Sequence, residues 1–340
     1  MRTTLQDIAS DTGLSVSTVS RILSRKSLSN SENEKSVLSS ARKLNYPYIL
    51  NNHVNNENHI NRIALITEIF EGEFYSSLFY WFYQASLESN CEFSQIESTH
   101  QKILSPEFIA SIRKNYDAIC ILFSEMTESE YETLMEMLGD MPAVSLAPIL
   151  NPYIDTVTFD SYRGGHLAAK HFEDLGYNKV GLIAGPSTKV EALYRKNGFL
   201  DHVAASKDME CVWTFKGDYS IEAGKQAYDD LKSKNLNDIA VFGSNDQTCF
   251  GFMKSVFEDG KSIPHDYAIC GYDDLPLCKN LFPELTSIHT DFFELGKATM
   301  RLLEKKLQGQ NDSNGHVSLI PVTINKRTST LGKVLSAVTI

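Results

Sequence analysis

The chain has few of the features that mark secreted, membrane-spanning or metal-binding proteins. None of its apolar runs approaches the roughly 20 residues that a membrane-spanning helix needs, and no signal segment opens the sequence. Its six cysteines show no paired metal-ligand spacing, and several lie within apolar runs such as AICILF and AICGYDD. Buried, reduced thiols suit a reducing compartment. These absences predict a soluble cytoplasmic protein without a metal site.

Common enzyme motifs are lacking as well. The sequence contains neither a nucleophile elbow nor a phosphate-binding loop. Acidic pairs such as Asp229–Asp230 and Asp273–Asp274 are chain neighbours, whose side chains point apart on a helix or turn. Such pairs are poorly placed for general acid/base catalysis. We therefore predict no catalytic residues, no cofactor and no enzymatic activity.

The charge is divided unevenly along a chain that is long enough for two or three domains. The 340 residues carry a net charge of −11. Residues 1–60 contain seven Lys or Arg and five Asp or Glu, which gives +2 and leaves −13 for the rest. A weakly basic head on an acidic body predicts that contact with nucleic-acid phosphates is confined to one end.

The segment TLQDIASDTGLSVSTVSR, residues 4–21, predicts two short helices joined by a tight turn. Thr4 can cap the first helix with Asp7 as its partner, and Gly13 can end that helix in the left-handed conformation. Apolar residues recur at helical spacing, and small hydroxyl and cationic side chains lie between them. That stripe is typical of a helix in a DNA major groove, whereas the alternative is an ordinary helical hairpin.

A third helix is predicted over residues 31–45, with Ser31 and Glu34 as its capping box and an apolar stripe that begins at Val37. It completes a three-helix head over residues 1–46. Residues 51–61 contain six Asn and almost nothing apolar, which is typical of a linker. We place a hinge or linker at 47–61.

Strand-like and helix-like segments alternate from residue 62 onward. Short apolar runs occur at RIALIT, AICILF, AVSLA, VGLIAG, IAVFGS and AICGYDD, and amphipathic stretches separate several of them. This alternation predicts an α/β fold with a doubly wound parallel sheet and helices on both faces. Because the region 62–330 is long for one sheet, we expect two lobes. Ligands in such folds bind beyond the carboxyl ends of the strands or between lobes.

The core ASDTGLSVSTVSR resembles the N-terminus of bacterial repressors of the LacI/GalR family, and FDSYRGGHLAAKHFEDLGYNKVGLIAGP, SNDQTCFGFMKSVFEDG and GYDD extend the resemblance along the chain. The resemblance implies a body similar to type I periplasmic sugar-binding proteins, with three crossovers between its lobes. Lobe one would hold 62–160 and 290–320, and lobe two 161–289 and 321–330. It also implies a homodimer on double-stranded operator DNA. The tail, 331–340, has no heptad repeat and predicts no tetramerising coiled coil.

The resemblance also assigns the head residues that would contact DNA. Val16 and Ser17 occupy the positions that most often set operator sequence in the family, and neither can make the bidentate base contacts of Arg or Gln. The predicted DNA contacts are Thr4, Ser15, Val16, Ser17, Thr18, Ser20, Arg21, Ser24 and Asn30.

Polar and aromatic side chains near predicted strand ends form the candidate effector site. Arg195, in YRKNGF, can grip hydroxyls or a carboxylate with its two-pronged guanidinium, unless it is a salt-bridge residue. Asp273 and Asn245 offer hydrogen-bonding groups for hydroxyls, although Asp273 could be a turn residue. Aromatic rings would stack on the ligand, and each is also a candidate core residue. With the matching family positions, the predicted set is Glu68, Phe74, Tyr75, Phe159, Arg195, Tyr219, Asn245 and Asp273.

This set indicates a polyhydroxylated ligand, and the resemblance implies a mono- or disaccharide, of the galactose or β-galactoside type, that relieves repression of carbohydrate-utilisation genes. Two alternatives stay open: a non-sugar small ligand, and a phosphorylated protein partner. Regulators of the second kind carry a basic patch at the start of lobe one. Here that region reads FEGEF, with no Lys or Arg between Arg62 and Lys102, which disfavours a phosphoprotein.

The hinge departs from the family pattern, in which an Ala-rich helix ends in a Leu that wedges into the minor groove and kinks the DNA. Here the segment reads NYPYILNNHVNNENHIN, and Asn55 occupies the expected Leu position, with Leu50 or Val54 available in a shifted register. We predict weaker kinking and looser coupling between head and body than is usual in the family. A fluorescence bend assay on operator DNA checks this; a full kink that Asn55→Ala abolishes would contradict it.

Overall fold

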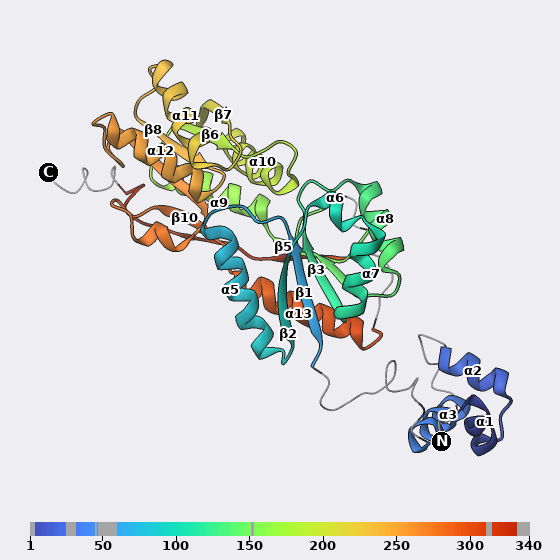
Figure 1. Cartoon of the computed structure of the whole chain (residues 1–340). Coiled ribbons are helices and arrows are strands. Elements are labelled where there is room, and N and C mark those ends of the chain that lie inside the picture. Colours follow the sequence, from blue (N-terminus) through green and yellow to red (C-terminus); the bar gives the residue numbers. More distant parts are fainter. Residues whose placement is uncertain are drawn as a thin grey trace. The chain divides into compact units, whose positions relative to one another are not determined.

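A computed structural model describes residues 4–24, 32–44, 46, 60–150, 153–310 and 315–331. The chain divides into two compact units, residues 1–60 and 61–340, both drawn in Figure 1. Several sequence-based predictions fall outside the described residues. They concern the cap Ser31, the DNA-contact candidate Asn30, the hinge positions Leu50, Val54 and Asn55, and the tail 332–340.

The first unit contains the three predicted helices: α1 (Leu5–Thr12), α2 (Val16–Ser24) and α3 (Glu32–Lys43). The Thr4 N–H donates to the Asp7 carboxylate over 2.7 Å, and Gly13 ends α1 with φ of 69°. Apolar residues of all three helices share one small core, in which Ile8, Val19 and Val37 are fully buried. The helix-turn-helix prediction is confirmed, including its cap and its turn.

In the second unit, lobe one is built on a parallel six-stranded sheet. Its strands, in the order in which they pair, are β11 (Val317–Ile320), β5 (Thr156–Phe159), β4 (Ala143–Ser145), β3 (Ala118–Leu122), β1 (Arg62–Thr67) and β2 (Glu92–Glu97). One face packs on α5 (Glu73–Glu88) and α13 (Phe292–Leu307), and the other on α6 (His100–Ile103), α7 (Pro106–Asn115) and α8 (Glu128–Leu138). Alternate residues of β1 therefore enter two separate cores.

Lobe two repeats this plan. Its strands, in pairing order, are β12 (Thr323–Asn325), β10 (Thr286–His289), β9 (Tyr267–Asp273), β8 (Ile239–Gly243), β6 (Lys179–Ala184) and β7 (Glu210–Lys216), and β12 alone among them is antiparallel to its neighbour. One face packs on α9 (Ser161–Asp174) and α10 (Val190–Ala205), and the other on α11 (Ile221–Ser233) and α12 (Asp246–Glu258). A short 3-10 helix, η1 (Pro276–Lys279), follows β9.

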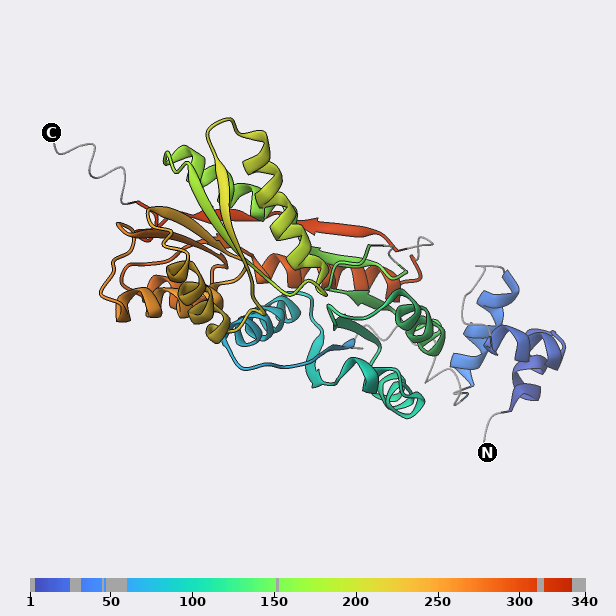
Figure 2. The same ribbon diagram turned by 90° about the horizontal axis from the view of Figure 1, so that it is seen from above.

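Three short connections join the lobes. The chain crosses between β5 and α9, between β10 and α13, and between β11 and β12. In Figure 2 the last of these crossings belongs to the red segment that passes from one lobe to the other. The two-lobed, doubly wound fold is thus as predicted. No helix among the described residues combines the length and apolar character that crossing a membrane requires.

Candidate functional site

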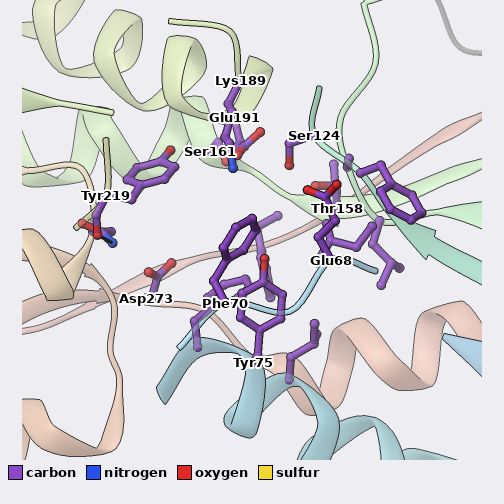
Figure 3. Close-up of a pocket in the computed structure, with 18 of the residues that line it drawn as sticks. Glu68, Phe70, Tyr75, Ser124, Thr158, Ser161, Lys189, Glu191, Tyr219 and Asp273 are labelled. Atoms are coloured by element: carbon purple, nitrogen blue, oxygen red, sulfur yellow. Dashed lines mark hydrogen bonds between the residues drawn. The ribbon is translucent and has the colours of Figure 1, made fainter. Parts of the chain in front are cut away.

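A cavity of about 380 Å³ lies between the lobes, beyond the carboxyl ends of strands from both sheets. Its volume falls within the range of small-molecule sites. The structure brings all eight predicted effector residues into its lining: Glu68, Phe74, Tyr75, Phe159, Arg195, Tyr219, Asn245 and Asp273. Figure 3 shows Tyr219 and Asp273 on one side of the cavity and Glu68 and Thr158 on the other. Effector binding by these residues stays a prediction.

Arg195 is the polar centre of the lobe-two wall. Its guanidinium donates from Nη1 to the Ser244 carbonyl over 2.6 Å and lies 3.4 Å from Oδ1 of Asp273 through Nη2. It also lies over two aromatic rings, 3.7 Å from the centroid of Tyr272 and 5.7 Å from that of Tyr219. The side chain is 8% exposed. A carboxylate and two ring faces thus compensate for a desolvated cation.

Glycines set the position of the Arg195 backbone. A Cβ on Gly165 of α9 would lie 1.9 Å from the Arg195 carbonyl oxygen, and a Cβ on Gly198 of α10 would lie 1.9 Å from that of Tyr162. The two helices therefore meet backbone to backbone, which only glycine allows. This contact holds α10 at a fixed depth, and Arg195 reaches the cavity from there.

Two of the predicted site residues have strained backbones. Asp273 ends β9 with φ of 108°, and Tyr219, which follows β7, has φ of 74°. A non-glycine residue held at positive φ costs on the order of 1–3 kcal/mol and survives where the surrounding structure demands it. Such residues cluster at functional sites, and both of these side chains are near Arg195 in the cavity wall.

Two carboxyl groups on the lobe-two side of the cleft have raised pKa values. Burial raises the pKa of Asp273 well above its ordinary value, although Arg195 opposes the rise. Burial also raises the pKa of Asp246, and the nearby negative charge of Asp273 adds to that rise. Asp246 is fully buried and accepts hydrogen bonds from the Ser287 hydroxyl over 2.6 Å and from the Leu275 N–H over 2.8 Å.

Asn245 lines the cavity but uses its side chain mainly for structure. Its Oδ1 accepts from the Thr248 N–H over 3.1 Å and so caps α12, and its Nδ2 donates to the Tyr219 carbonyl over 2.9 Å. One amide hydrogen is left for a ligand. Asn245 therefore holds the strained Tyr219 loop in place as well as facing the cavity.

Aromatic rings form most of the lobe-one wall. Phe74 packs edge-on against Tyr75 and Phe292, with centroid distances of 5.2 and 5.4 Å, and Phe159 packs against Phe292 at 5.6 Å. The same rings contact the lobe-one core. The core and contact interpretations of these residues are therefore compatible, because one edge of each ring is buried and another faces the cavity.

Sequence reasoning missed several lining residues, of which Glu191 matters most. It lies one helical turn before Arg195 on α10, so the spacing of four residues could have revealed a shared face. Phe70, Ser124 and Lys189 were missed too, because they lie in loops without a pattern. The predicted Glu68 accepts a 3.3 Å hydrogen bond from the His100 N–H at the edge of the cavity.

In the head, the described DNA-contact candidates are Thr4, which precedes α1 as its N-cap, Ser15, which lies in the turn, and residues of α2. Thr4, Ser15, Ser17 and Arg21 are exposed, whereas Val16, Thr18 and Ser20 are partly buried. The Ser15 hydroxyl caps α2 by accepting from the Thr18 N–H over 3.2 Å. Ser24 is the last residue of α2. The most accessible predicted base-reading residue is thus Ser17.

Comparisons with known proteins find a matching family model for a part of each unit. Residues 4–47 match the family described as bacterial regulatory proteins, lacI family, and residues 169–330 match a periplasmic binding protein-like domain. The chain is 26% identical over 329 residues to the HTH-type transcriptional repressor PurR of Haemophilus influenzae, which covers 94% of this chain and 96% of that protein.

Solved structures with this fold include complexes with small ligands. The Lac repressor dimer bound to operator and the anti-inducer ONPF aligns with a TM-score of 0.71 at 23% identity, over 98% of this chain and 100% of that one. A LacI family transcriptional regulator from Enterococcus faecium with bound ribose aligns with a TM-score of 0.68 at 26% identity, over 79% of this chain and 98% of that one.

The raised pKa of Asp246 predicts how stability varies with pH. Because the folded protein holds this proton at pH values where an unfolded Asp, with a pKa of about 4, has lost it, the free energy of unfolding falls as pH rises towards neutrality. Asp246→Asn imitates the protonated form, since its amide can donate to Ser287 and accept from Leu275. We expect the variant to be the more stable protein at about pH 8 and to vary less with pH.

Thermal melts between about pH 5 and 8 measure this effect. Replacement of the exposed Asp208 by Asn is the matched control and should leave the pH profile of the melting temperature unchanged. An Asp246→Asn protein that melts below the wild type at the alkaline end would show that the carboxylate is ionised in the folded state.

Proposed function

We infer that the chain belongs to the lacI family of bacterial regulatory proteins, and from this premise we propose that it is a repressor whose affinity for operator DNA is set by a sugar in the interlobe cavity. On this proposal it is a regulator and not an enzyme. The observation that carries the sugar proposal is the wall around Arg195, where a guanidinium, a carboxylate and an amide face aromatic rings across a closed space. Polar groups of this kind bind hydroxyls, and ring faces bind the apolar side of a sugar. We expect such a regulator in the cytoplasm.

Homodimer formation through the body is part of this proposal. Helix α5 presents large apolar side chains to solvent: Tyr80, Trp81, Tyr83 and Leu87 are 41–57% exposed. A surface of this kind on a single helix is typical of a protein interface. Two heads carried by one dimer would bind successive major grooves of a roughly palindromic operator.

Contacts across the mouth of the cavity supply the means of regulation. The Leu277 N–H of lobe two donates to the Glu73 carboxylate of lobe one over 3.0 Å, and the Thr188 hydroxyl donates to Glu125 over 3.1 Å. A ligand that touches both lobes adds to these contacts and favours the closed arrangement. Because Glu73 begins α5, closure would act on the proposed dimer interface. Coupling of this kind is typically about 1–3 kcal/mol.

The charge of the cavity argues against a phosphorylated partner or ligand. Its lining contains six carboxylates and only two side chains with a permanent positive charge, Lys189 and Arg195. A phosphate group would enter a field of its own sign. We therefore favour a sugar without phosphate. A sugar of the proposed galactose or β-galactoside type would bind through its hydroxyls to the polar side chains around Arg195.

The head predicts two different outcomes for two substitutions on α2. Exposed Ser17 faces away from the head core and is expected to contact base edges, so Ser17→Ala should change the preference among operator sequences. Arg21→Ala should weaken binding about equally on all operators and lower the salt dependence of binding, because a phosphate contact is lost. Electrophoretic mobility shifts on an operator panel at two salt concentrations measure both. Equal loss on every operator from Ser17→Ala would contradict this division.

The cavity predicts a ligand-dependent rise in melting temperature. A panel of galactose, lactose, glucose, fructose and raffinose, with sugar phosphates and nucleobases as further arms, should contain a neutral sugar that stabilises the protein by mass action. Arg195→Ala should abolish that shift, because the variant lacks the guanidinium group and its contacts with the aromatic rings. Exposed Arg163 on α9 provides the matched control, and Arg163→Ala should leave the shift unchanged.

Operator binding without ligand shows whether the Arg195 variant is folded. If only a nucleobase or a phosphate shifts the melting temperature, the sugar proposal is wrong and the cavity serves another ligand.

A further inference from the structure

Several polar atoms in the cavity wall are buried without a hydrogen-bond partner. Among the described residues these atoms include Oε2 of Glu191, Nε of Arg195 and the hydroxyl of Tyr219, and Oδ1 of Asp273 has only the 3.4 Å ion pair with Arg195. All four residues line the same cavity. Folded proteins leave few buried polar atoms unpaired, so a cluster of them at one cavity indicates a ligand that pairs with them.

Negative charge predominates among the lining side chains. The carboxylates are Glu68, Glu71, Glu125, Glu191, Asp218 and Asp273, and the permanent cations are Lys189 and Arg195. Arg195 is already paired with Asp273 at 3.4 Å, and the Lys189 ammonium lies 5.9 Å from the ring centroids of both Phe70 and Tyr219. The charges of Arg195 and Lys189 also act on Glu191, but neither cation of the described lining forms a close ion pair with it.

Glu191 is the carboxylate that most needs a partner. Burial raises its pKa, although Arg195 opposes the rise, and the Ser124 side chain of lobe one lies near the carboxyl group. Figure 3 shows Glu191 and Ser124 together at one end of the cavity, away from Tyr219 and Asp273. A ligand group that reaches Glu191 therefore also reaches the other lobe.

We propose that the effector is an amino sugar, whose protonated amine pairs with Glu191 while its hydroxyls contact Arg195 and Asp273. This inference rests on the sugar proposal above and narrows it. An ammonium group supplies three donors and a positive charge, which match the carboxylate of Glu191 and reduce the excess negative charge of the lining. A neutral hydroxyl supplies one donor and no charge. Phosphorylated and acidic sugars are repelled by the same carboxylates.

The ammonium also links the lobes. Glu191 belongs to α10 of lobe two and Ser124 follows β3 of lobe one. The amine would lie at this junction, and the sugar ring would extend towards Asp273 past the aromatic side chains of Phe70 and Tyr75. Binding at Glu191 thus favours closure of the lobes, which is the step through which the proposed regulation acts.

Titration calorimetry on the full-length protein tests the proposal with matched ligand pairs. Glucosamine, galactosamine and mannosamine are compared with glucose, galactose and mannose, and with their N-acetyl derivatives, at about pH 6.5, where a primary amine is protonated. We expect at least one amino sugar to bind at least about tenfold more tightly than both its neutral parent and its N-acetyl form, as a desolvated charge pair requires.

Two variants that each remove one negative charge assign the effect to a residue. Glu191→Gln should remove the preference for the amine and change the dissociation constant of the neutral parent by less than about threefold. Glu107→Gln, at an exposed position on α7 outside the lining, should keep the preference. Operator binding by both variants shows that they are folded.

Each result has a definite meaning. If a neutral sugar binds and its amino counterpart binds no more tightly, the inference fails while the sugar proposal stands. A preference for the amine that survives Glu191→Gln also overturns the inference, because Glu191 is then not the partner. If neither kind of sugar binds to a protein that still binds operator DNA, the sugar proposal fails and the inference fails with it.

Discussion

The burial of one guanidinium between a carboxylate and two aromatic rings is the constraint on which the cleft depends. A guanidinium as little exposed as that of Arg195 is stable only when nearby groups balance its charge and accept its hydrogen bonds. The Asp273 carboxylate and the Tyr272 ring balance the charge, and the Ser244 carbonyl accepts a hydrogen bond. The strained φ of Asp273 and the backbone contact at Gly165 follow from this need, since both hold partners at the required distance. Residues of this cluster keep buried polar atoms without a hydrogen-bond partner and line the cavity, and the proposed ligand would complete their pairing.

The two lobes have separate cores, so a ligand bound at the Arg195 cluster can change how the lobes are arranged. Each sheet is covered on both faces by its own helices, so each lobe can move as a rigid body about the three short connections. Contacts between the lobes include polar ones, such as that of Glu73 with the Leu277 N–H, and the rings of Phe74 and Phe159, which also pack against the lobe-two cores. A ligand that touches both walls adds to these contacts and favours the closed arrangement. The proposed regulation depends on this closure.

The fold was predictable wherever burial leaves a clear pattern. The central strands β1, β3, β6, β8 and β9 are buried on both faces and appear as apolar runs, so each was predicted. The edge strands β2 and β7 were not predicted, because sequences such as EFSQIE expose alternate side chains and carry charges. Glu68, Phe159 and Asp273 lie at or just after strand ends, where the topology brings side chains together, whereas Arg195 lies on α10. Glu191 was missed because a Glu near an Arg on a helix is usually a surface residue.

The sequence by itself determined the helix-turn-helix head, the two-lobed α/β body and the resemblance to a known family, because capping residues, apolar periodicity and short motifs are local properties. Only the tertiary structure decided which charges face one another. The cavity volume, the unpaired oxygen of Glu191 and the use of Asn245 as a helix cap depend on segments that are far apart in the chain. Burial changes the energy of a charge far more than the residue type does, and burial is a property of the assembled fold.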